Sequence, residues 1–334
     1  MPSRVIAITG ASAGVGRAVA LAFARKGELV GLIARSEAAL LDAQTEVERE
    51  GVQAAIFPAD VADPVAVRNA ADHIEQALGP IDIWINCAMV TVYSRVDDMT
   101  PEEYRRVTEV TYLGYVHGTC EALSRMKRRG RGTIIQVGSA LAYRSIPLQS
   151  AYCAAKAAIR GFTESLRCEL IHDKSPIQLC AVHLPAVNTP QFSWARVHMP
   201  HHPQPVPPIY RPEVAAEAIV FAAEHPERRE YWIGMPSVKA ILGNRIAPGL
   251  LDRIMAKRTW SGQFTAERIS PTRPDNLFAP VEGLHDTYGI FSDRSEAFSL
   301  QARLARHKWA LAGCAAGFTA VLLAGLLGAI RSRR

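Results

Sequence analysis

Short apolar runs alternate with amphipathic stretches along the first 235 residues, and this alternation constrains the fold more than any other feature. The apolar runs lie at residues 4–10, 28–34, 53–60, 81–86, 132–139, 177–185 and 230–234. Helical patterns cover residues 14–26, 36–50, 64–78, 101–128, 150–173 and 213–225. Continuous apolar strands that alternate with helices are typical of a parallel sheet covered on both faces. The sequence therefore predicts a doubly wound α/β domain with a parallel seven-stranded sheet.

The remaining sequence is less regular. Prolines gather at 200–212, "PHHPQPVPPIYRP", which predicts a stiff loop rather than a helix or strand. Pro and Gly residues also interrupt 240–300, where we expect short helices and loops. We predict three parts: an α/β domain at 1–240, an extension at 241–305 and a tail at 306–334.

The tail holds 22 residues without a charge, at 309–330, "WALAGCAAGFTAVLLAGLLGAI". As an α-helix this stretch spans roughly 33 Å, enough to cross a hydrocarbon core of about 30 Å. Trp309 stands at one end, and three basic residues flank each side, so their charge does not orient the segment. We expect a single-pass membrane helix here, in preference to a core helix or an oligomerisation helix.

The distribution of charge argues against nucleic acid as a partner. The net charge is +6, and all of that excess lies in residues 301–334, so the rest of the chain is neutral.

The six cysteines are scattered without a CxxC pair, which indicates reduced thiols rather than a zinc site or disulfides. The chain enters a strand-like run at residue 4 with no signal peptide before it, so we expect the α/β domain to be cytoplasmic.

The turn between the first strand and the first helix is rich in glycine: "TGASAGVG", residues 9–16. Glycines let a backbone approach a pyrophosphate closely, and a helix N-terminus supplies N–H donors to it. A tight strand–helix turn uses glycine as well, so the turn alone is a moderate signal. The candidate phosphate-binding residues are Thr9, Gly10, Ser12, Gly14, Val15 and Gly16.

A tyrosine and a lysine lie one helical turn apart in "SAYCAAKAAIRG", residues 150–161. Tyr152 and Lys156 share a helix face. A tyrosine with a pKa of about 10 is a poor acid or base at neutral pH, and a nearby ammonium would lower that pKa. Catalysis and simple packing both remain possible for YxxxK alone.

The joint pattern of TGxxxGxG, a serine at Ser139 and YxxxK thirteen residues later resembles the short-chain dehydrogenase/reductase family over residues 4–235. The resemblance implies a Rossmann fold with strand order 3-2-1-4-5-6-7 and hydride transfer with a nicotinamide cofactor. It implies that Ser139 binds the substrate oxygen and that Tyr152 is the general acid and base. It also implies that Lys156 lowers the pKa of Tyr152 and binds the nicotinamide ribose.

Two positions depart from the family pattern. The usual asparagine of the long helix is Thr111, in "VTYLG", which puts the proton relay from Lys156 in doubt. The usual NNAG is "NCAM", which keeps Asn86 and Ala88 and replaces the glycine by Met89. A catalytically weak NADP-binding scaffold at a membrane therefore remains the alternative to an enzyme.

Cofactor choice follows from the end of the second strand, "GLIARSE". No carboxylate stands there to repel a 2′-phosphate, and Arg35 can pair with one, so we predict NADP(H). By resemblance, Asp60 contacts the adenine and Thr189 holds the nicotinamide amide, and Val61, next to Asp60, is a further candidate for cofactor binding.

The segment after Thr189 stands where the family has its substrate lid. Phe192, Trp194 and Tyr210 are candidates for an apolar pocket. The histidines of "VHMPHHP" lie on a proline-rich loop without a thiolate or carboxylate partner, so we predict no metal site. An anchor and an aromatic lid favour a lipophilic carbonyl or alcohol substrate. By resemblance, a homodimer or tetramer is expected.

Overall fold

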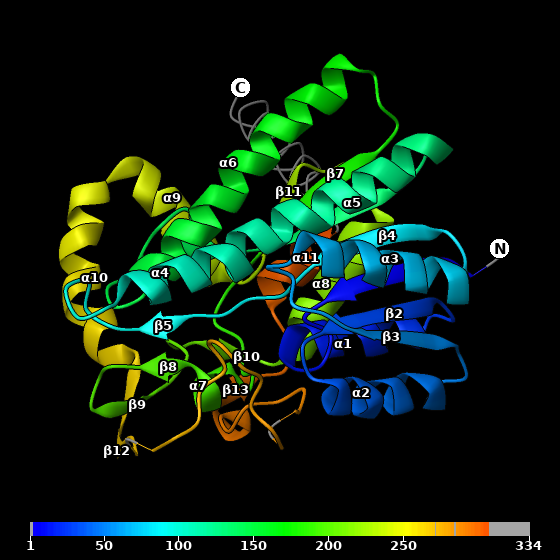
Figure 1. The fold of residues 1–334 in the computed structure, drawn as a ribbon. Coiled ribbons are helices and arrows are strands. Elements are labelled where there is room, and N and C mark those ends of the chain that lie inside the picture. Colours follow the sequence, from blue (N-terminus) through cyan, green and yellow to red (C-terminus); the bar gives the residue numbers. More distant parts are fainter. Residues whose placement is uncertain (1–2, 271, 284, 307–334) are drawn as a thin grey trace, which may run out of the picture.

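The computed structural model describes residues 3–306 apart from 271 and 284, and its centre is a parallel sheet (Figure 1). The strand order is β11-β7-β6-β4-β1-β2-β3, and each pair of neighbouring strands is parallel. The strands are β1 Val5–Thr9, β2 Leu29–Ala34, β3 Ala54–Pro58, β4 Ile81–Asn86, β6 Thr133–Ser139, β7 Gln178–Leu184 and β11 Glu230–Trp232. The seven-stranded parallel sheet is confirmed.

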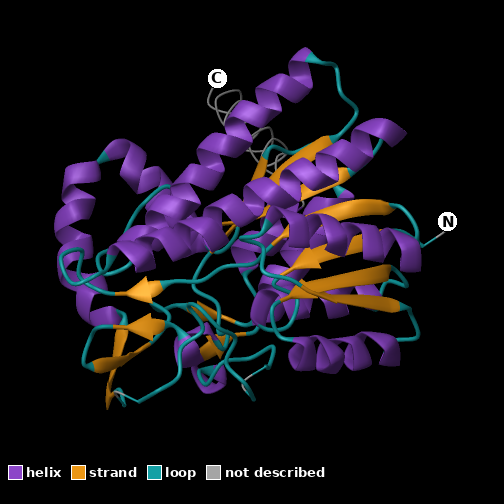
Figure 2. Ribbon diagram, viewed as in Figure 1, coloured by secondary structure: helices purple, strands orange, loops and turns teal. Residues whose placement is uncertain are grey.

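Helices cover both faces of this sheet (Figure 2). They are α1 Gly14–Ala24, α2 Glu37–Arg49, α3 Pro64–Leu78, α4 Pro101–Thr108, α5 Gly114–Arg129, α6 Ser150–His172 and α8 Pro212–Glu224. Strand β1 shows why both faces are apolar: Ile6 and Ile8 join the core under α1, α2 and α8, while Val5 and Ala7 join the core under α3 to α6. Side chains of a strand alternate between faces, so a strand buried on both sides is apolar at most of its positions.

The helical region predicted at 101–128 is interrupted by one π-helical turn, η1 Glu109–Leu113. Thr100 and Glu103 form a capping box at the start of α4, so the beginning of the region is fixed locally. Thr111 lies inside this turn, and its hydroxyl bonds to the backbone of a loop that follows β4. Single π-helical turns of this kind are frequent at functional sites.

The C-terminal part of the described chain packs on the α/β body. It contains α9 Met235–Ile246, α10 Pro248–Gly262, β12 Phe264–Arg268, η3 Ser292–Arg294, β13 Ser295–Glu296 and α11 Leu300–Arg306. Short elements of the body are β5 Val92–Tyr93, η2 Ala140–Ala142, α7 Gln191–Trp194 and β8 Arg196–Val197. Leu277 and Ala302 are buried in the two cores of the sheet, so this part completes the hydrophobic interior.

The prediction of a loop without elements at 200–212 is wrong. This stretch contains β9 His201–Pro203, which pairs with β12, and β10 Ile209–Tyr210, which pairs with β13. Both partner strands come from far along the chain, so proline content could not reveal them.

Within the described residues, no helix has both the length and the apolar character needed to cross a membrane. The span predicted at 309–330 lies outside the described residues.

Candidate active site

A cavity of about 450 Å³ opens at the carboxyl ends of β1, β4 and β6. This is where open parallel sheets bind ligands. Many of the residues singled out in the sequence line it: Gly10, Ser12, Gly14, Val15, Gly16, Arg35, Asp60, Val61, Ala88, Ser139, Tyr152, Lys156 and Thr189. The cavity is therefore continuous from the glycine turn to the Tyr–Lys pair.

The glycine turn is held by close backbone packing. Gly10 has a φ of +70°, and a Cβ atom there would lie 2.8 Å from the Cα atom of Ala88. A Cβ atom on Gly16 would lie 2.1 Å from the carbonyl oxygen of Gly10. The first residue of α1 has no side-chain cap before it. Such a turn suits the close approach of a pyrophosphate, and the residues present fit a dinucleotide at this position.

Thr9 and Asn86 lie behind the cavity wall instead of lining it. The Thr9 hydroxyl accepts hydrogen bonds from the N–H groups of Cys87, at 3.0 Å, and Ala88, at 3.2 Å. Asn86 is fully buried, and its amide donates to Thr119 and Gln136, each at 3.0 Å. Thr9 thus fixes the start of the loop after β4, and Asn86 ties the end of β4 to α5 and β6, so both support the wall without facing the cavity.

Thr111 also lies outside the cavity. Its hydroxyl donates to the carbonyl of Val90 at 2.8 Å and accepts from the Val90 N–H at 3.0 Å. Val90 directly follows Met89, so the two departures from the family pattern are neighbours in space. Thr111 is fully buried and both its contacts are with backbone. Its observed role is to hold the loop that carries Met89.

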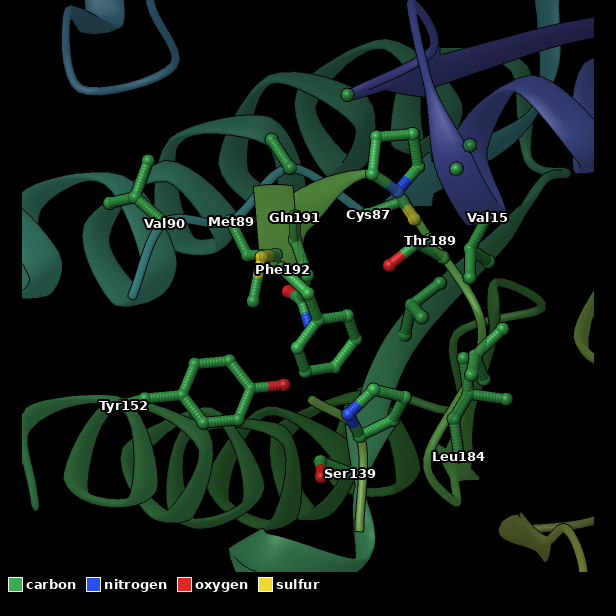
Figure 3. Close-up of a pocket in the computed structure, with 18 of the residues that line it drawn as sticks. Val15, Cys87, Met89, Val90, Ser139, Tyr152, Leu184, Thr189, Gln191 and Phe192 are labelled. Carbon is green, nitrogen blue, oxygen red and sulfur yellow. The ribbon is translucent and has the colours of Figure 1, made fainter. Parts of the chain in front are cut away.

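Ser139 and Tyr152 face the same part of the cavity (Figure 3). Ser139 ends β6, and its hydroxyl accepts a hydrogen bond from the N–H of Leu141 at 3.1 Å, which fixes its rotamer. Burial raises the pKa of Tyr152 well above its usual value, and a hydrogen bond with Ser139 opposes this only in part. The Tyr–Lys spacing predicts a lowered pKa for Tyr152, whereas in the protein by itself this pKa is raised.

The orientation of Lys156 explains this difference. Its Nζ donates to the Tyr115 hydroxyl and to the Val137 carbonyl, each at 2.9 Å, and lies 5.7 Å from the centre of the Tyr152 ring. Lys156 is 3% exposed, and this burial lowers its pKa to about 8. The ammonium is thus held near Tyr152 without a hydrogen bond to its hydroxyl.

Beyond Tyr152 the cavity becomes apolar. Met89 and Val90 come from the loop after β4, and Phe192 from α7 (Figure 3). The inner sides of α9 and α10 add Pro236, Ala240 and Met255 to the wall. These surfaces suit an apolar molecule that presents one polar group to Ser139 and Tyr152.

Of the three aromatic candidates, Phe192 and Trp194 line the cavity, and Tyr210 does not. Tyr210 lies in β10, where its N–H donates to the Ala186 carbonyl at 2.9 Å and its carbonyl accepts from the Asn188 N–H at 2.8 Å. Its ring packs in the main core, so it fixes the loop instead.

His198 has a structural partner. Its Nε2 lies 2.9 Å from the carboxylate of the buried Glu103, so the ring ties the β8–β9 segment to α4. Across the described part of the chain, no group of three or more His, Cys, Asp or Glu side chains has the arrangement of a metal site.

The opposite end of the cavity holds a segment that the sequence did not indicate. We call residues 273–291, without residue 284, the strap. Asn276, Pro280, Val281 and His285 of the strap line the cavity. The strap is anchored at the glycine turn, where the Gly14 N–H donates to the Asp286 carbonyl at 2.9 Å.

Arg35 lines this end of the cavity, and its side chain contacts the strap. Its guanidinium donates to the carbonyl of Asn276 at 2.5 Å and to that of Leu277 at 3.4 Å. Asp60 accepts from the Ala62 N–H at 3.0 Å, and its other oxygen forms an ion pair with Arg106. Arg106 belongs to no sequence motif. Its position one turn before the π-helical turn is the only feature that could have marked it as a site residue.

Comparisons with known proteins agree with this geometry. The short chain dehydrogenase family model matches residues 4–197. Oxidoreductase YxnA of Bacillus subtilis is 35% identical over 86% of this chain and 81% of its own length. A fatty acyl-CoA reductase of Acinetobacter baylyi is 29% identical over 76% of this chain and 83% of its own length.

Among solved structures, an alcohol dehydrogenase of the archaeon Thermococcus sibiricus, complexed with 5-hydroxy-NADP, is similar with a TM-score of 0.60 and 25% identity. The match covers 69% of this chain and 95% of that one. Fold, site and sequence thus lead to one conclusion: the chain belongs to the short-chain dehydrogenase family of oxidoreductases.

Proposed function

We propose that this protein is an NADP(H)-dependent oxidoreductase that interconverts a carbonyl group and a secondary alcohol on a lipophilic substrate. The observation that carries the proposal is the single cavity that joins the glycine turn to Ser139, Tyr152 and Lys156. A cofactor site and a proton-transfer site in one cavity are what hydride transfer requires.

The bound cofactor would supply or accept the hydride. Tyr152 would give the proton to the substrate oxygen, or take it in the reverse reaction. Ser139 would hydrogen-bond that oxygen and orient it toward the tyrosine. Lys156, protonated at neutral pH with a pKa of about 8, would place a positive charge beside the tyrosine and favour its deprotonated form.

The choice of NADP(H) is supported by the end of β2. Ala34 stands there in place of a carboxylate, and Arg35 follows at the cavity wall. The similar alcohol dehydrogenase of Thermococcus sibiricus was solved with 5-hydroxy-NADP, which supports the same choice.

A lipophilic substrate is supported by the apolar walls around Met89, Phe192 and Met255. The relative from Acinetobacter baylyi is named a fatty acyl-CoA reductase, which points to long apolar chains. The proposal includes a membrane anchor at 309–330, supported by the 22 uncharged residues of that stretch. Resistance of the full chain to alkaline extraction from membranes would test the anchor.

The function is tested by turnover of the full chain with NADPH and a panel of long-chain ketones and aldehydes. We expect Tyr152→Phe to abolish turnover and to leave NADPH binding intact, since the hydroxyl is needed only for proton transfer. Tyr112→Phe, which changes a tyrosine that is not part of the cavity wall, is the matched control. Tight NADPH binding without turnover on any of these substrates would favour the scaffold alternative.

A further inference from the structure

Two guanidinium groups converge on one backbone carbonyl beside the glycine turn. Arg35, which follows β2, donates to the Leu277 oxygen at 3.4 Å, and Arg106 of α4 donates to the same oxygen at 3.0 Å. Leu277 itself is fully buried, and the Arg106 side chain is 11% exposed. Arg35 and Asp60 line the cavity at this end, and Arg106, which is not part of the lining, contacts both Asp60 and the Leu277 carbonyl.

The charges at this point are not balanced. Asp60 pairs with Arg106 and is the carboxylate that acts on Arg35, so two cations face one anion and the neutral carbonyls of Asn276 and Leu277. Burial lowers the pKa of Arg35, and the charge of Arg106 lowers it further, while Asp60 opposes both effects. A carbonyl oxygen is a weaker acceptor for guanidinium than a doubly charged phosphate.

The strap uses main-chain oxygens in the same way at the glycine turn. The Asp286 carbonyl accepts from the Gly14 N–H, and the His285 carbonyl accepts from Arg17. The strap therefore places carbonyl oxygens on donors at the glycine turn and on the guanidinium groups of Arg35 and Arg106.

We infer that Arg106, together with Arg35, binds the 2′-phosphate of NADP(H), and that the Leu277 carbonyl holds this position until the phosphate replaces it. The inference rests on the proposed function and adds to it a second residue that selects NADP(H) over NAD(H). It also gives the strap a role, because binding of the phosphate requires its carbonyl to move away from the two guanidiniums.

The experiment compares binding of NADPH and NADH to the full-length protein and its Arg106→Gln variant, followed by nicotinamide fluorescence. Arg105→Gln is the matched control, because it removes the same charge from the neighbouring, exposed position of α4. We expect Arg106→Gln to weaken NADPH binding about tenfold or more, the effect of losing a charge-assisted contact, and to change NADH binding less than about twofold. Arg105→Gln should bind both as the wild type does.

A fragment experiment removes any contribution of the nicotinamide. Adenosine 2′,5′-bisphosphate and adenosine 5′-monophosphate differ only in the 2′-phosphate, so Arg106→Gln should weaken the first and leave the second unchanged. Thermal unfolding of the variants without ligand shows whether each remains folded. Arg106→Lys should recover part of the preference, because it keeps the charge and loses the planar fork.

The possible outcomes distinguish a failure of this inference from a failure of the proposed function. If the wild type prefers NADPH, and Arg106→Gln weakens NADPH and NADH equally or neither, the inference is wrong and the function stands. Arg106 would then either position Asp60 beside the adenine or only hold the strap in place. If the wild type binds neither cofactor, both the proposed function and the inference fail.

Discussion

Replacement of Lys156 by methionine should stabilise the protein at neutral pH even though it removes a site residue. Lys156 is 3% exposed and its two hydrogen bonds go to the Tyr115 hydroxyl and the Val137 carbonyl. Tyr115 itself donates to the same Val137 carbonyl at 2.9 Å. The methionine variant therefore leaves that buried acceptor with a partner, and the main change is the loss of a buried charge.

The size of the effect follows from the two pKa values of Lys156. Its pKa is about 8 in the folded protein, against about 10.4 in an unfolded chain. At about 1.4 kcal/mol per unit, the buried ammonium costs about 3 kcal/mol. The folded pKa is the lower one, so the unfolded chain binds more protons between pH 8 and pH 10.4. The cost is fully present below pH 8 and disappears as the pH rises to 10.4.

The measurement is the free energy of unfolding in urea for the wild type and Lys156→Met at several pH values from 7 to 10.5. We expect the stability of the variant relative to wild type to fall by about 3 kcal/mol over this range. Lys257→Met is the control, because it removes one positive charge at an exposed position. A difference between Lys156→Met and wild type that stays constant with pH would refute the reasoning, since Lys156 would then titrate as in the unfolded chain.

Three further changes test other parts of the molecule. Gly16→Ala places a Cβ atom 2.1 Å from a backbone oxygen of the glycine turn. Because this would displace a phosphate contact, titration should show NADPH binding weakened roughly tenfold or more. Gly161→Ala, with open space around it, is the control and should leave binding unchanged. Thr111→Val leaves both backbone groups of Val90 without a partner, so urea unfolding should show a loss of about 2 kcal/mol or more, and Thr111→Ser should lose less. Burial acts to raise the pKa of Glu230, but hydrogen bonds from neighbouring side chains lower it to about 2. The ionised carboxylate therefore stabilises the folded protein fully above about pH 4.3, and this stabilisation is lost as the pH falls through 2. The stability gap between wild type and Glu230→Gln should therefore narrow in acid, and a gap that stays constant from pH 6 to pH 3 would contradict this.

The elements of the sheet could be predicted from the sequence because each one is fixed locally. The apolar runs of β1 and β4 are buried on both faces, and the capping box at Thr100 starts α4 at Pro101, the predicted first residue. The strand order was an expectation from the resemblance, carried by the glycine turn and YxxxK. Seven short parallel strands alone allow several orders.

Other parts depended on partners that are distant in the sequence. No local pattern at 200–212 announces β9 and β10, since their partners β12 and β13 lie about 60 and 85 residues further along the chain. Thr111 and Asn86 were identified by position, yet their contacts with Val90 and Gln136 place them behind the cavity wall. Residue type does not say which way a side chain faces once the backbone makes a π-helical turn.

The strap also carries a consequence for the order in which the protein folds. Arg17 and His285, which it joins, are 268 residues apart. Because synthesis runs from the N-terminus, β1 and α1 leave the ribosomal tunnel well before the segment that closes their ligand cavity. Contacts of such long sequence separation form slowly, because the chain between them must first be ordered. The glycine turn is thus made long before the wall opposite it, and the cavity between them is complete only after that wall has been synthesised and packed.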